Sequence, residues 1–321
     1  MKKATAAVLA CVACVSAAYG QTVPDFPQRP LRLITGFLPG GVSDTIARVV
    51  GEKLGERLGQ RVVVDGRPGA GGVLSMELAA SANPDGHTLY LGQPVITISP
   101  NFKRKPPFDP ITAFAPVSQI GTGPTMLTVH PGLPVSSVKE LIAHARTQSG
   151  GLRYGSSGPG TTNHFSGELL RVMAGMPLTH VPYRGAANVV VAAIQGEIHI
   201  AFLPLLAAIP HVKANRLKGL AVTSAKRSKA VPDLPTVAET IPGYAVEAWY
   251  GIVVPAKTPT AIVQKLNGTL AQVLAAPEVR ERLAGQGVEV DHLGPAPFAD
   301  MIRKDAARWA KLVKEGGITL E

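Results

Sequence analysis

Residues 31–59 read LRLITGFLPGGVSDTIARVVGEKLGERLG, and this stretch decides the fold. Its first part, Leu31–Phe37, is a short apolar run bounded by turn residues, which predicts a buried β-strand. In Asp44–Leu58 apolar residues recur every four positions and charged residues occupy the other faces, so an amphipathic helix is predicted there. A strand that passes through a glycine-rich turn into a helix is the repeating unit of α/β proteins.

The same unit recurs along the chain. Further apolar strands are predicted at Val62–Val64, Leu89–Leu91, Leu127–Val129, Leu152–Tyr154, Val181–Tyr183, Ile198–Phe202, Leu220–Thr223 and Ile252–Val254. Further helices are predicted from Ser137 and at Phe165–Ala174, Ala187–Gln195, Leu205–Ala214, Ala261–Ala275, Pro277–Ala284 and Pro297–Glu315. Strands that alternate with helices indicate a mainly parallel sheet covered on both faces.

The last third of the chain is rich in predicted helices and poor in strands. Because so few strands cannot form an independent sheet, these helices are predicted to return to the first domain. The expected organisation is a discontinuous domain 1, residues 21–122 with 248–321, and an inserted domain 2, residues 123–247. Two segments of the chain would cross between them.

The first twenty residues have the features of a secretory signal peptide. Lys2 and Lys3 precede an uncharged apolar run, and Ala18-Tyr19-Gly20 places small residues where a signal peptidase requires them. The sequence around Cys11 also resembles a lipid-attachment site, so cleavage after Gly20 and lipidation at Cys11 both stay open. Either way the pattern predicts export.

Composition excludes several kinds of site. Both cysteines, Cys11 and Cys14, lie in the predicted leader, so the mature chain is expected to have no thiol nucleophile, disulfide or cysteine-ligated metal. The net charge of +10 either keeps the protein soluble without a functional meaning or provides a positive field that attracts anions. Nucleic acid is not expected, because the basic residues are scattered and only 5% of residues are aromatic.

Ligands of open α/β sheets bind beyond the carboxyl ends of the strands. The first loop at such a position is Phe37–Asp44, in which Gly40 and Gly41 let backbone N–H groups approach a ligand. The helix that follows adds a partial positive charge at its N-terminus, and Ser43 or Asp44 is predicted to cap it. This loop is therefore a candidate anion site.

A second glycine-rich turn, Gly66–Gly72, could also cradle an anion. Its Arg67 either recognises the ligand or ties the turn down, and the sequence leaves both roles open.

A third loop, Gly155–His164, carries four hydroxyl groups, those of Ser156, Ser157, Thr161 and Thr162. Neutral donors can satisfy a desolvated carboxylate without a buried charge of their own. A compatible alternative is a capped turn with Thr162 or Asn163 at the N-cap of the next helix.

No motif for catalysis, nucleotides or metal occurs. There is no phosphate-binding G-x-x-x-x-G-K-[ST], no G-x-S-x-G and no histidine pair at zinc spacing. His164, beside the hydroxyls, is expected to be a donor or a cap. These residues favour a binding protein without catalytic residues, metal or cofactor; the alternative is an exported α/β enzyme that acts on a carboxylate.

The motifs together resemble the Bug-type extracytoplasmic receptors, the solute-binding proteins of tripartite tricarboxylate transporters. The matching segments span almost the whole mature chain and lie at residues 37–48, 59–64, 67–72, 84–86, 157–160, 167–170, 180–185, 220–224 and 249–251.

The resemblance implies a periplasmic-binding-protein type II fold, with two α/β lobes, a central cleft and two crossing strands. It implies a periplasmic, monomeric receptor that does not span the membrane and delivers a small carboxylate to the transmembrane subunits of a tripartite transporter. The ligand-binding residues that follow are Phe37, Gly40, Gly41, Asp44, Gln93, Ser156, Ser157, Thr161, Thr162 and Tyr183.

Two positions depart from the family pattern. The family often has an acidic residue where Leu203 stands, and the loop that contains Gln93 is less polar than usual. If Leu203 faces the cleft, the pocket is more apolar than usual, and these departures suggest a mono- or dicarboxylate with an aromatic or aliphatic body.

Overall fold

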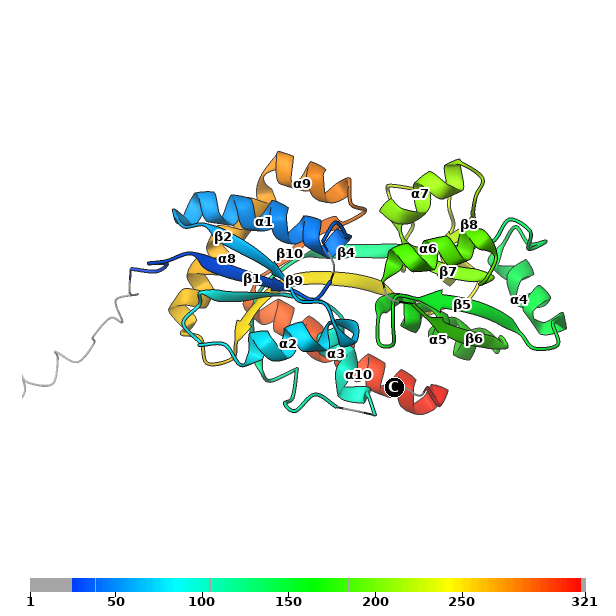
Figure 1. Ribbon diagram of the computed structural model, residues 1–321, viewed down its shortest axis with the longest axis horizontal. Helices are drawn as coiled ribbons and strands as arrows, with labels where there is room; N and C mark the ends of the chain where they lie inside the picture. The colour runs from blue at the N-terminus through cyan, green and yellow to red at the C-terminus, as the bar shows by residue number, and fades with distance from the viewer. Residues whose placement is uncertain (1–24, 38, 104, 184, 319–321) are drawn as a thin grey trace, which may run out of the picture.

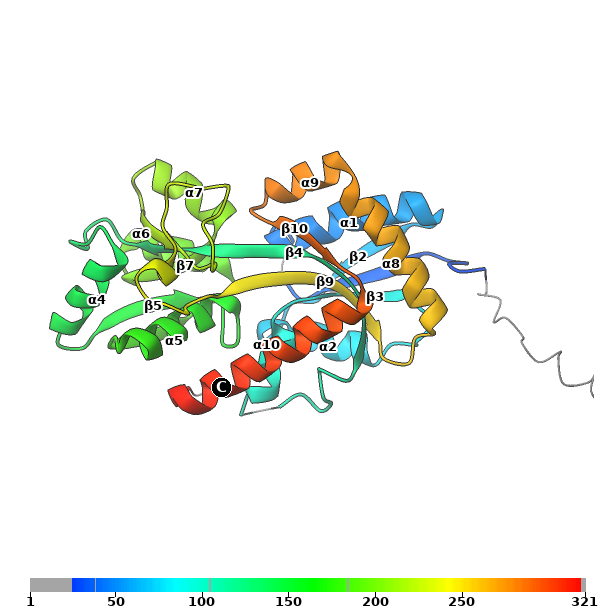
Figure 2. The ribbon, with the colours of Figure 1, turned by 180° about the vertical axis from the view of Figure 1, so that it is seen from behind.

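The computed structural model describes residues 25–37, 39–103, 105–183 and 185–318, so the predicted signal peptide lies outside it. Two α/β lobes lie side by side and are joined by two long strands, β4 (Phe114–Val129) and β9 (Glu247–Pro255) (Figure 1). The two strands are antiparallel neighbours, and both run from one lobe into the other (Figure 2).

The sheet of the first lobe has the strand order β2-β1-β3-β9-β4, with β10 also paired to β4. Its other strands are β1 (Leu31–Thr35), β2 (Val62–Gly66), β3 (Thr88–Gly92) and β10 (Glu289–Leu293). Its helices are α1 (Val42–Leu58), α2 (Val73–Ala80), α3 (Val95–Ile98), α8 (Thr260–Ala275), α9 (Pro277–Ala284) and α10 (Pro295–Gly316), with the 3-10 turns η1 (Ala70–Gly72) and η2 (Ser99–Asn101).

The sheet of the second lobe has the order β4-β7-β5-β6, with β8 also paired to β4. Its other strands are β5 (Leu152–Ser156), β6 (Leu178–Pro182), β7 (Ile200–Pro204) and β8 (Lys218–Val222). Its helices are α4 (Val138–Thr147), α5 (Thr162–Ala174), α6 (Ala186–Gln195) and α7 (Leu205–Lys213), with the 3-10 turn η3 (Val237–Glu239).

The prediction of a mainly parallel sheet is right for only part of each lobe. Strands β2, β1 and β3 are parallel, and so are β6, β5 and β7. Every pair that contains β4 or β9 is antiparallel, because the chain leaves on β4 and returns on β9.

The first lobe forms around the strand and helix that open it. Ile46, Val50 and Leu54 lie on the predicted apolar face of α1 and are fully buried against Leu33 of β1 and Leu266 of α8. Burial of each such side chain stabilises the fold by about 1.5–3 kcal/mol. The apolar face of α1 thus fixes the helix over the sheet and positions the loop that precedes it.

Helix α10 is shared between the lobes. Its first half packs Phe298 and Ile302 against the first lobe, whereas Trp309 is buried in the apolar cluster of the second lobe. Trp309 meets Phe165 of α5 edge to face, with ring centroids 4.6 Å apart. Figure 2 shows the helix running from one lobe toward the other, so α10 is a third connection besides β4 and β9.

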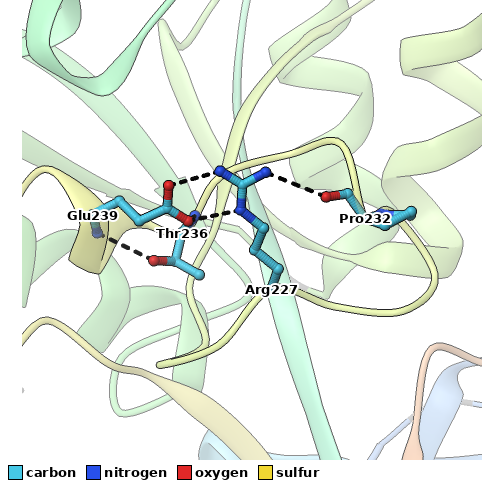
Figure 3. A network of polar contacts seen from close by, with 4 residues as sticks. All are labelled: Arg227, Pro232, Thr236 and Glu239. Atoms are coloured by element: carbon cyan, nitrogen blue, oxygen red, sulfur yellow. Dashed lines mark hydrogen bonds and ion pairs between the residues drawn. The ribbon is translucent and has the colours of Figure 1, made fainter.

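The return to β9 is held by a polar network (Figure 3). Thr236 and Glu239 form a capping box at η3, and Arg227 binds both carboxylate oxygens of Glu239, at 2.7 and 2.8 Å. Hydrogen bonding from Arg227, and then from the Thr236 N–H, lowers the pKa of Glu239 to about 2.

In the part of the chain that the structure describes, no helix is long and apolar enough to cross a membrane.

Candidate functional site

Three loops follow the carboxyl ends of β1, β2 and β3 in the first lobe. Because these strands are parallel, the loops gather at one edge of the sheet. We refer to Phe37–Asp44 as the first-lobe loop and to Gly66–Gly72 as the glycine turn. The third loop carries Gln93.

Asp44 braces the first-lobe loop but does not cap α1. The N-cap is Gly41, without a side-chain cap, so the prediction of Ser43 or Asp44 at that position is wrong. Both residues lie in the first turn, where Asp44 accepts hydrogen bonds from Gly40 N–H at 3.1 Å and Arg48 Nε at 2.9 Å. Burial alone would raise the pKa of Asp44, but Arg48 and Gly40 hold it below the usual value. The carboxylate is therefore charged and already paired.

Gln93 is joined to the first-lobe loop from the side. Its Nε2 donates to Ser43 Oγ at 3.0 Å, and both residues are buried. This bond fixes the orientation of the Gln93 amide relative to α1. Within the described residues the amide oxygen has no hydrogen-bond partner, so it can accept from a ligand or a bridging water.

The glycine turn lies behind Phe37. A Cβ atom on Gly72 would be 3.9 Å from Phe37 Cε2 and 3.5 Å from Val95 Cγ1, so the two apolar side chains flank the Gly72 backbone. Arg67 pairs with Asp65 at 2.9 Å, and Asp65 also binds Arg32. Of the two roles left open for Arg67, the structure supports the one that ties the turn down.

In the second lobe the loop Ser156–Thr162, here the second-lobe loop, connects β5 to α5. Thr161 is the N-cap of α5 without a side-chain cap, so the predicted N-cap at Thr162 or Asn163 is wrong by one or two residues. The Thr161 hydroxyl instead donates to Gly158 O at 2.6 Å. The Ser157 hydroxyl donates to Asn163 Oδ1 at 3.0 Å.

Most of the predicted hydroxyl donors are thus occupied within the loop. Ser156 is fully buried, and its Oγ accepts from Gly158 N–H and lies 2.6 Å from His180 Nε2. Among the described residues, the hydroxyl of the half-buried Thr162 has no hydrogen-bond partner. Thr162 is therefore the member of this group that can donate to a ligand.

Backbone amides supply further donors in both lobes. The first intrahelical hydrogen bonds are Thr45 N–H to Gly41 O in α1 and Phe165 N–H to Thr161 O in α5. The amides of residues 42–44 and 162–164 thus lack helical acceptors, as expected at helix N-termini. Such amides, with the partial positive charge of the helix, attract anions.

Two histidines, the buried His164 and the half-buried His180, contact the second-lobe loop. His164 Nδ1 accepts from Gly160 N–H at 3.0 Å, so the prediction of a structural role for His164 agrees with its position, although it accepts rather than donates at this nitrogen. Burial, and then the neighbouring His180, lowers the pKa of His164 to about 3, and burial lowers that of His180 to about 4. Both rings are neutral at physiological pH. Sequence reasoning missed His180, whose only signal was its place in the segment 180–185.

The side chains of Tyr183 and Leu203 contact residues outside the predicted site. Tyr183 N–H donates to Ser156 O, but its hydroxyl donates to Glu197, 3.5 Å away, rather than to another predicted site residue. Leu203 is fully buried in an apolar cluster with Val189 and Met126. Leu203 therefore does not face the cleft, so the condition under which it would make the ligand site more apolar is not met.

The loops of the two lobes meet at the glycine turn. A Cβ atom on Gly71 would lie 2.9 Å from Pro159 O of the second-lobe loop, and Gly71 adopts φ +64. Only glycine fits this close approach without strain. Gly71, missed as a site residue, thereby places the second-lobe loop next to the turn that supports Phe37.

A surface concavity of about 630 Å³ between α1 and β2, near Glu52 and Val63, contains none of these loops.

Comparison with known proteins agrees with this architecture. The family described as tripartite tricarboxylate transporter family receptor matches residues 46–318. The structure of R. palustris Rpa4515 with adipate is 36% identical, covers 92% of this chain and 99% of its own, and has a TM-score of 0.85. The periplasmic binding protein BugD is 28% identical with a TM-score of 0.83, over 92% of this chain and 100% of its own.

A further solved structure, MatC (Rpa3494) from Rhodopseudomonas palustris with bound malate, is 28% identical. It covers 90% of this chain and 100% of its own, with a TM-score of 0.79. The predicted fold and the predicted resemblance are both confirmed: this chain has the periplasmic-binding-protein fold and belongs to the tripartite tricarboxylate transporter receptor family, of the Bug type.

Proposed function

We propose that this chain is a periplasmic receptor that captures a small mono- or dicarboxylate and delivers it to the transmembrane subunits of a tripartite transporter. The observation that carries the proposal is the pair of braced loops, one on each lobe, that precede helices with unpaired N-terminal amides. Asp44 holds one loop and His164 the other. Related structures with adipate and malate support a carboxylate as the ligand class.

The ligand is proposed to have an aliphatic or aromatic body. With Leu203 in the core, this part of the proposal rests on Phe37 and Val95, whose side chains both lie against the Cα of Gly72 at the edge where the first-lobe loops gather. Apolar side chains beside a polar loop favour a ligand with a hydrocarbon body.

An exported enzyme is the weaker alternative. Ser156 and His180 are within hydrogen-bond distance, as a nucleophile and its base would be. However, Ser156 is fully buried and also hydrogen-bonded to Gly158, so it is closed to a substrate. A binding role without turnover is therefore proposed.

The test is a thermal-shift and calorimetric panel of linear dicarboxylates of increasing length, with adipate, malate, citrate and benzoate included. A ligand at 100 times its Kd should stabilise the protein by about 2.7 kcal/mol. We expect adipate to bind more tightly than citrate. No shift with any acid would contradict the proposal, and hydrolysis of added esters by the purified protein would favour the enzyme.

A further inference from the structure

One segment of the first lobe reaches the ligand loops of both lobes. It begins at Gln93, which is hydrogen-bonded to Ser43, continues through α3 and η2, and ends at Phe102. We refer to residues 93–102 as the bridging segment. Figure 1 shows α3 beside α10, between the two lobes.

The end of the bridging segment presses on the second-lobe loop. Phe102 is 8% exposed and belongs to the apolar cluster of the second lobe, together with Tyr154 and Phe165. A methyl group on Gly160 would collide with the Phe102 ring, so the ring lies directly against the Gly160 backbone. Gly160 has φ +73, and its N–H is the one that His164 accepts. The loop is thus held between Phe102 and His164.

The middle of the bridging segment is anchored. Thr97 Oγ1 donates to Asp305 Oδ2 of α10 at 2.7 Å, and the same oxygen accepts from Trp249 Nε1 of β9 at 3.1 Å. One carboxylate oxygen therefore ties the segment to the shared helix and to a crossing strand. Such a fixed base allows Phe102 to set the position of a loop on the opposite lobe.

We propose that Phe102 is a positioning residue for ligand binding. It holds the second-lobe loop at a fixed position relative to Gln93 and the first-lobe loop. The proposal rests on the proposed function for the ligand, whereas the contact between Phe102 and Gly160 exists without a ligand. Loss of the ring would free the loop and weaken binding without removal of any group that touches the carboxylate.

The test compares Phe102→Ala and Phe102→Leu with Phe114→Ala. Phe114 is a buried phenylalanine of the first lobe that stacks on Tyr90, so its removal also costs stability but leaves the second-lobe loop untouched. Hydrogen exchange of amides 156–164 is measured without ligand, and adipate affinity by calorimetry. Phe102→Ala is expected to speed exchange and to raise the adipate Kd, each about tenfold, and Phe102→Leu to restore most of both.

Gly160→Ala provides a second, independent measurement. Its methyl group is expected to disturb the loop strongly in the wild type, and less when Phe102→Ala removes the ring, so the two changes should not be additive. Additive effects, or loop exchange in Phe102→Ala within twofold of Phe114→Ala, would overturn the proposal. If wild type binds neither adipate nor any other acid of the panel, the proposed function fails, and loop exchange alone still decides the role of Phe102.

Discussion

His164 and His180 stack nearly parallel, with ring centroids 4.0 Å apart, beneath the second-lobe loop. Each ring fixes a different point of the loop, His164 at Gly160 and His180 at Ser156. Burial opposes a charge on either ring, and charging both would add repulsion between them, so the support of the loop depends on their neutrality.

The first prediction is a loss of stability in mild acid. The pKa of His164 is about 3 in the folded protein, well below the ordinary histidine value of 6.5 that applies in the unfolded chain, so the unfolded chain takes up the proton first. The contribution of neutral His164 is therefore complete above pH 6.5 and is lost as pH falls toward 3. We expect unfolding in urea to show about 2 kcal/mol less stability at pH 5 than at pH 7.5 from this group alone.

His164→Asn keeps an acceptor for Gly160 N–H and removes the titration, so its stability should depend less steeply on pH. An unchanged pH profile in His164→Asn would mean that other groups dominate acid unfolding.

The second prediction concerns Asp44. Asp44→Ala removes the acceptor of Gly40 N–H and the partner of Arg48, so the first-lobe loop loses its brace. The expected loss of adipate binding free energy is about 1–3 kcal/mol, measured by calorimetry. Glu56→Ala on the exposed face of the same helix should bind like the wild type.

The third prediction separates the two neighbouring threonines of the second-lobe loop. Thr161→Val loses a buried bond to Gly158 O, which should lower the free energy of unfolding by about 1–3 kcal/mol. Thr162→Val removes a hydroxyl that has no hydrogen-bond partner among the described residues, so it should weaken adipate binding and leave stability within about 0.5 kcal/mol. The reverse pattern would show that Thr161, not Thr162, faces the ligand. Thr269→Val on α8 is the matched control for binding.

The fourth prediction concerns the shared helix. Trp309→Ala should leave a cavity beside Phe165 and cost about 3–5 kcal/mol of stability, measured by urea unfolding. The control is Lys311→Ala, two residues along α10 on its exposed face, which should leave the free energy of unfolding nearly unchanged. A small effect of Trp309→Ala would mean that α10 is not needed to complete the second-lobe core.

Local patterns were enough to predict most elements and the loops between them. The strand at Leu31 could be predicted because it is a short apolar run, and the helix that ends at Leu58 because its apolar residues recur on one face. Strand β10 was missed because its residues Glu289–Leu293 are mostly polar, and its strand conformation depends on pairing with β4. The strand at Ile198–Phe202 was predicted, but not that it extends past Leu203 or that the Leu203 side chain enters the core.

Residue types at fixed spacing were enough to predict the α/β class, the family and the glycine- and hydroxyl-rich loops. Which hydroxyls can reach a ligand depends on how the loop folds. Thr161 and Thr162 are adjacent in sequence, yet within the described residues one is bonded inside its loop and the other has no hydrogen-bond partner. The same holds for Phe102, whose neighbour Gly160 is far along the chain. Such contacts depend on how the lobes pack, which no local pattern encodes.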